Sequence, residues 1–119
     1  MATIDLAVKR VYDDPAGSDG YRVLVDRLWP RGVSKDRAHL DEWLKELGPS
    51  TDLRKWFGHD VAKWDEFRER YRAELADAAD LWQPLLDRAG KGRVTLLFGA
   101  HDPDHNQAVV LKEFLQERA

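Results

Sequence analysis

The chain has 119 residues, which suits one domain spanning residues 1–119 with a single hydrophobic core. It has a net charge of −3 and no cysteine, which excludes disulfide bonds, thiolate metal ligands and a cysteine nucleophile. With no signal-peptide pattern and no apolar run long enough to cross a membrane, we expect a cytoplasmic protein without membrane contact. The oligomeric state is left open.

Three segments have the pattern of β-strands. Ile4 to Val8 alternates apolar and polar residues, as a half-buried strand does. Residues 22–28 and 94–98 are almost continuously apolar, which is typical of strands covered on both faces. The long interval between these two allows a crossover, so we expect them to be parallel. The direction of the first strand does not follow from the pattern.

Helical patterns fill the interval between the second and third strands. Asp41 is predicted to cap a short helix that ends before Pro49, and Ser50 to cap a second helix that ends at Gly58. Asp60 is predicted to open the longest helix, with an apolar face formed by Val61, Trp64, Phe67, Tyr71 and Leu75.

Two more helices complete the expected set. One contains Trp82, with Pro84 in its first turn, where a proline is tolerated. The last begins with Asp102 as N-cap and Pro103 at the first helical position. The prediction is a single α/β domain: a small, mainly parallel sheet of about three strands wrapped by helices, a Rossmann-like sandwich.

Positive charge is concentrated in the second strand and the segment that follows it. Residues 21–37 contain five basic and two acidic side chains, a net charge of +3, so the rest of the chain carries −6. An acidic chain lacks the wide basic surface that nucleic-acid binding needs, but a local pocket for a small anion remains open. We expect Trp29-Pro30-Arg31-Gly32 to form a fixed turn at its edge, with Trp29 largely buried and Gly32 at positive φ.

Ligands of open α/β sheets bind beyond the carboxyl ends of the strands. Guanidinium groups bind phosphate and carboxylate, and an aromatic ring can stack on a base. The candidate ligand-binding residues are Arg27, Trp29, Arg31, Lys35, Arg54, His105 and Asn106.

Asp26 and His59 are the candidate catalytic residues. Asp26 suits a general base if it is desolvated, but pairing with a neighbouring arginine is the simpler interpretation and the one we favour. We expect no metal and no cofactor, because Pro103 makes the segment between His101 and His105 a helix start, with poor geometry for two ligands.

Several runs resemble the Domain of Unknown Function 488 family, in particular its small YeaO-like branch. They are Val25-Asp26-Arg27-Leu28-Trp29-Pro30-Arg31-Gly32, Leu53-Arg54-Lys55-Trp56-Phe57-Gly58-His59, and Thr95-Leu96-Leu97-Phe98 with His105-Asn106-Gln107-Ala108. The resemblance implies an α/β sandwich with a parallel first strand and a pocket, but no settled reaction. Other branches carry a Cys-His-Arg triplet where this chain has Asn106, Gln107 and Ala108.

Two functions are compatible with these features. One is an enzyme that binds or acts on a phosphate-bearing or other anionic small molecule, nucleotide-like, at the carboxyl ends of the strands. The other is a non-catalytic interaction or regulatory module, favoured by the missing triplet. A strongly perturbed pKa of Asp26 or His59 in an open cleft would favour the enzyme.

Overall fold

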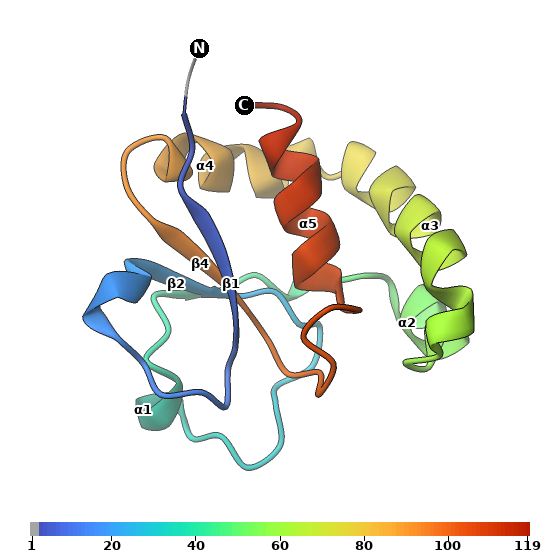
Figure 1. The fold of residues 1–119 in the computed structure, drawn as a ribbon, viewed down its shortest axis with the longest axis horizontal. Helices are drawn as coiled ribbons and strands as arrows, with labels where there is room; N and C mark the ends of the chain where they lie inside the picture. Colours follow the sequence, from blue (N-terminus) through green and yellow to red (C-terminus); the bar gives the residue numbers. More distant parts are fainter. Residues whose placement is uncertain (1–2) are drawn as a thin grey trace.

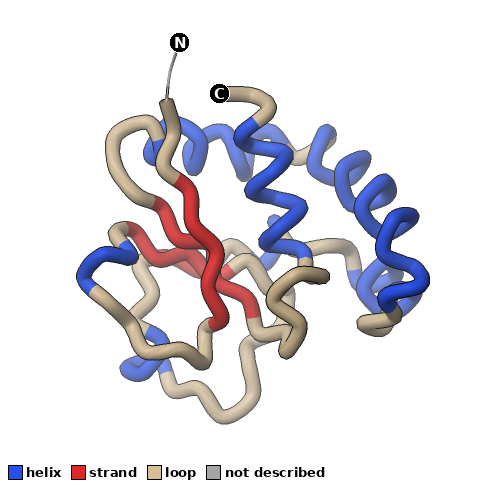
Figure 2. The backbone as a smooth tube through the Cα atoms, viewed as in Figure 1, coloured by secondary structure: helices blue, strands red, loops and turns tan. Residues whose placement is uncertain are grey.

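The computed structural model describes residues 3–119 and is built around one parallel sheet (Figures 1 and 2). Its spatial order is β1-β4-β2-β3, with bounds β1 (Leu6–Arg10), β2 (Tyr21–Leu24), β3 (Glu42–Trp43) and β4 (Val94–Phe98). The α-helices are α1 (Lys35–Ala38), α2 (Thr51–Phe57), α3 (Trp64–Ala76), α4 (Ala79–Ala89) and α5 (Gln107–Gln116). All pairs in the sheet are parallel, including β1 with β4. The predicted α/β fold is confirmed.

The sheet has a large core on one face and a small one on the other. Successive residues of β4 alternate between them: Leu96 and Phe98 belong to the large cluster, whereas Leu97 belongs to the small one. Figure 1 shows α3, α4 and α5 together on one side of the sheet and α1 on the other. Burial on both faces explains why the β4 segment is apolar throughout.

The fourth strand, β3, corrects the prediction of a helix capped by Asp41. The Asp41 carboxylate accepts a hydrogen bond from the Arg22 backbone N–H at 2.8 Å, and the Asp41 N–H donates to the Arg22 carbonyl at 2.9 Å. Asp41 therefore docks its segment onto β2, and only a short 3₁₀ helix, Lys45–Leu47, follows. Pairing with a neighbouring strand outweighed the local capping signal.

Three helix boundaries also differ from the prediction. The helix α5 begins at Gln107 with Asn106 as N-cap, because the Asp102 carboxylate instead accepts from the backbone of the following turn. Asp60 caps a short 3₁₀ helix, Val61–Lys63, and α3 begins only after it. Pro84 lies inside α4, not in its first turn, and is exposed, so the carbonyl group it leaves unpaired can bond to water.

A buried ion pair, which the sequence did not indicate, supports β2. Arg22 and Asp19 are 4% and 7% exposed and their side chains form an ion pair. The Arg22 guanidinium also donates to the carbonyls of Ala38 and His39 at the end of α1. The Thr95 hydroxyl of β4 donates to the Asp19 carbonyl at 2.6 Å. Asp19 therefore anchors the end of the segment before β2 to the sheet.

Replacing Arg22 by alanine should cost about 3 to 5 kcal/mol of unfolding free energy, because it leaves a buried carboxylate with less compensation. The control is Arg31→Ala, since Arg31 is exposed, and its cost should be less than about 1 kcal/mol. Urea unfolding followed by tryptophan fluorescence measures both. Equal midpoints for the two variants would contradict the assignment of Arg22 as structural.

Candidate functional site

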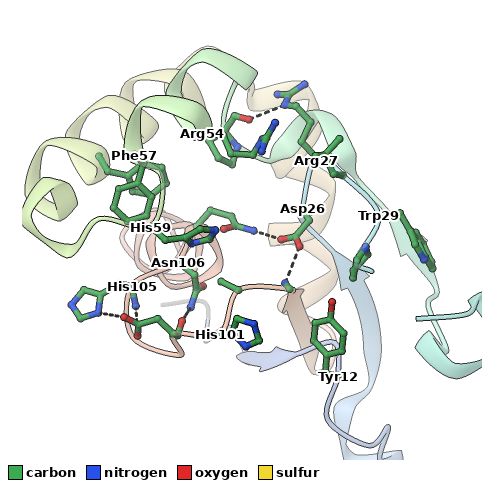
Figure 3. A pocket seen from close by; sticks show the side chains of 18 residues that line it. Tyr12, Asp26, Arg27, Trp29, Arg54, Phe57, His59, His101, His105 and Asn106 are labelled. Carbon is green, nitrogen blue, oxygen red and sulfur yellow. Dashed lines mark hydrogen bonds and ion pairs between the residues drawn. The ribbon is translucent and has the colours of Figure 1, made fainter. Parts of the chain in front are cut away.

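A cavity of about 460 Å³ opens at the carboxyl edge of the sheet, beyond β1, β2 and β4 (Figure 3). Seven of the nine candidate residues line it: Asp26, Arg27, Trp29, Arg54, His59, His105 and Asn106. Arg31 and Lys35 are exposed and are not among its lining residues. The cavity also has apolar and aromatic walls that include Leu28, Phe57 and Phe67.

Asp26 lies where β2, β4 and α5 meet. Its Oδ2 accepts the Gly99 backbone N–H at 2.8 Å, and its Oδ1 accepts a hydrogen bond from the side-chain amide of Gln107 (Figure 3). The expected pairing with an arginine is wrong, since within residues 3–119 Asp26 forms no ion pair. A Cβ atom at position 99 would stand 2.8 Å from Asp26 Oδ2, so a larger residue than Gly99 would have to displace the carboxylate.

Burial raises the pKa of Asp26 to about 6, although the hydrogen bonds from Gly99 and Gln107 lower it in part. Both donors are neutral, so no positive charge in direct contact with Asp26 compensates the charge of its carboxylate. A carboxyl group with this pKa exchanges its proton near neutral pH and can act as an acid or a base.

The two arginines of the site have different roles. Arg27 donates from Nε to the Pro49 carbonyl at 2.7 Å and from Nη2 to the Gly48 carbonyl at 3.0 Å. These contacts fasten the end of β2 to the segment that enters α2. The Nε atom of Arg54 is buried and has no hydrogen-bond partner among residues 3–119. Because Arg54 also lines the cavity, its guanidinium is the one of the two with hydrogen-bonding capacity left beside a ligand.

The segment before α5, residues 102–106, is stabilised by hydrogen bonds among its own polar groups. The Asn106 side chain is 2% exposed, caps α5 by accepting from the Val109 N–H, and donates to the Asp102 carbonyl at 3.0 Å. His105 Nδ1 lies 2.8 Å from Asp102 Oδ2, and its ring packs edge-on against Trp64. The hydrogen bond from the Asp104 backbone N–H, followed by those from His105, lowers the pKa of Asp102. Asn106 is thus occupied as a cap, although it lines the cavity.

His59 reaches the cavity from the turn after α2. Its backbone lies in the left-handed region, with φ at 59°, directly after Gly58 at 51°. This conformation is uncommon for a residue with a side chain and costs about 1 kcal/mol. It directs the chain sharply back from α2, and Figure 3 shows His59 beside the cavity.

The turn at Trp29 borders the other side of the cavity. Trp29 is half-buried, less than expected; its Nε1 donates to the Val33 carbonyl at 2.6 Å and its ring packs edge-on against Trp43. Gly32 has the predicted positive φ, 74°. The Tyr12 hydroxyl donates to the Arg31 carbonyl at 2.9 Å. The backbone of Arg31 is therefore fixed, while its side chain extends away from the protein core.

Sequence reasoning missed Tyr12, Gly99 and Gln107 as parts of the site. Gly99 directly follows β4 and Tyr12 lies two residues after the end of β1, so a search of every strand end for further residues could have found them. Gln107 had no such signal, because its contact with Asp26 depends on the position at which α5 begins. Among residues 3–119, no group of three or more side chains is suited to a metal ion, and no helix is long and apolar enough to cross a membrane.

Comparison with known proteins assigns the chain to a family. A family model described as "Inactive DUF488-N3 subclade" matches residues 5–119. The chain belongs to this family. It is 49% identical over 113 residues to the uncharacterized protein YeaO of Escherichia coli, covering 95% of this chain and 98% of YeaO. An uncharacterized protein of Mycobacterium bovis is 40% identical over 111 residues, 93% of each chain. No solved structure matches significantly.

The raised pKa of Asp26 should appear in the pH dependence of stability. Asp26 holds its proton more tightly when folded, so its ionisation destabilises the folded protein as the pH rises from about 4 to 7. The stability of wild type minus that of Asp26→Asn should therefore fall by about 2 to 3 kcal/mol over this range. Urea unfolding of both proteins at each pH measures the difference. A constant difference would mean that Asp26 titrates normally.

Proposed function

We propose that this protein binds a nucleotide-like anionic small molecule in the Asp26 cavity, and that Arg54 meets an oxygen of its phosphate or carboxylate group. The observation that carries the proposal is the buried Arg54 Nε without a partner. A buried donor left without an acceptor costs about 1 to 3 kcal/mol. An anionic oxygen relieves this cost and forms a charge-assisted hydrogen bond.

The walls of the cavity support a planar ligand. Phe57 and Phe67 both line it and stack on each other with ring centroids 4.3 Å apart, which gives a fixed aromatic surface. The two rings are 5% and 2% exposed, so they give the cavity an apolar wall against which a planar ring can pack. The volume of about 460 Å³ is within the usual range of small-molecule sites.

Binding without conversion is favoured by the groups at the end of β4. The family description is of an inactive subclade, and the chain has no cysteine nucleophile. The residues at the positions of the triplet have structural roles: Asn106 caps α5, Gln107 holds Asp26, and Ala108 is buried. A module that recognises its ligand therefore fits better than an enzyme with the chemistry of the other branches.

The test is a thermal-shift and calorimetric screen of AMP, GMP, CMP, UMP and inorganic phosphate at pH 7. At least one nucleotide should raise the melting temperature by several degrees. Arg54→Gln should weaken its binding by about tenfold or more, since a hydrogen bond to a charged group is lost. Lys55→Gln removes the same charge from an exposed neighbour and should leave affinity unchanged. Absence of any shift, or equal affinity of the Arg54 variant, would overturn the proposal.

A second candidate function is acid–base catalysis by Asp26, favoured by its raised pKa in an open cavity. In that case a bound nucleotide should release phosphate or free base on incubation at pH 6, and Asp26→Asn should abolish the release. Phosphorus NMR and chromatography of the mixture detect both products. A nucleotide recovered unchanged after long incubation would exclude this activity and leave binding alone.

A further inference from the structure

The polar groups around the cavity differ in how fully the protein itself uses them. The donors of Arg27 face two backbone carbonyls, and both ends of the Asn106 amide are occupied. The Tyr12 hydroxyl donates to a carbonyl group as well. Two groups with capacity left are the Arg54 Nε and the carboxylate of Asp26. A ligand that fills this cavity has to complement both.

The Asp26 carboxylate is only half used by the protein. An ionised carboxylate offers about four lone-pair positions. Asp26 accepts one hydrogen bond at each oxygen, from Gly99 and from Gln107. Its side chain lines the cavity, so the remaining positions are open to a bound molecule.

The free lone-pair positions of the Asp26 carboxylate favour a hydrogen-bond donor on the ligand. A phosphate or carbonyl oxygen of the ligand would meet a carboxylate with no cation paired to it, and like partial charges repel. An N–H group supplies a donor to a partly desolvated acceptor, where a hydrogen bond is strong. Because Gly99 and Gln107 fix the carboxylate, little freedom is lost when the ligand binds.

We propose that Asp26 is the specificity-determining residue of the cavity and accepts a hydrogen bond from an amino group on the ring of a heteroaromatic nucleotide. This inference rests on the proposed function and adds the ligand class. Arg54 meets the anionic end of the molecule, and Asp26 selects its ring. A site built to accept from an N–H group discriminates strongly against the analogue that lacks it, because its own acceptor is then left unpaired.

The experiment uses pairs of probes that differ only in the ring amino group. AMP is compared with purine riboside 5′-monophosphate, GMP with IMP, and CMP with zebularine 5′-monophosphate, by calorimetry at pH 7. Within each pair the phosphate is the same, so a difference in affinity reports on the ring alone. In at least one pair the amino form should bind roughly tenfold more tightly or better.

Two variants separate the role of the carboxylate from that of the fold. Asp26→Asn should reduce this preference to about twofold or less, because a neutral amide oxygen accepts more weakly. Gly99→Ala should reduce it as well, since its Cβ would displace the Asp26 carboxylate without removing it. The control is Asp36→Asn, an exposed carboxylate outside the cavity, which should keep the full preference.

The two proposals fail in different ways. If nucleotides bind but all three pairs bind equally to the wild type, or if Asp26→Asn keeps the full preference, the inference is overturned and the proposed function stands. If no probe binds at all, the proposed function fails and the inference fails with it.

Discussion

The carboxylate of Asp26 is the point on which the carboxyl edge of the sheet depends. It follows β2, accepts from the backbone just after β4 at 2.8 Å, and accepts from the first residue of α5. One side chain thus joins three elements that are distant in sequence. The cost is a carboxylate with a raised pKa and no charged partner, beside an open cavity. A buried acid that only served stability would be paired with a cation.

The molecule contains such a pair elsewhere, and the contrast is informative. Asp19 and Arg22 are buried together, and the hydrogen bonds from its partners lower the pKa of Asp19 although its burial opposes this. The guanidinium of Arg22 also donates hydrogen bonds to the backbone carbonyl at the end of α1. This pair stabilises β2 and the end of α1, and neither residue lines the cavity. Asp26 and Arg54 instead keep unused hydrogen-bonding capacity beside a cavity, which supports the proposal that this cavity binds a ligand.

Two residues at the start of α5 have structural roles. Gln107 positions Asp26, and Asn106 begins α5 by accepting the Val109 N–H. The cavity keeps its aromatic walls and its place at the carboxyl ends of parallel strands. A fold that has lost a reactive group can keep its pocket, since the packing that forms the pocket does not depend on that group. Under the proposed function, recognition of a ligand is the role that this pocket serves.

The sequence by itself determined the class of fold and the region of the site. Continuous apolar patterns at β2 and β4 fixed the buried strands, and the charges directly after β2 marked the cavity. Ser50 and Gly58 are the N-cap and C-cap of α2, as predicted, because a capping residue interacts with backbone groups only a few residues away. The tertiary structure decided which residues distant in the chain form hydrogen bonds with each other, and a short stretch of sequence does not show such partners. Asp41 forms a hydrogen bond to β2 instead of capping a helix. Asp26 accepts hydrogen bonds from Gly99 and Gln107 instead of pairing with an arginine. These partners are distant in the chain, so only the packing of strands and α5 could select among the donors that each carboxylate had available.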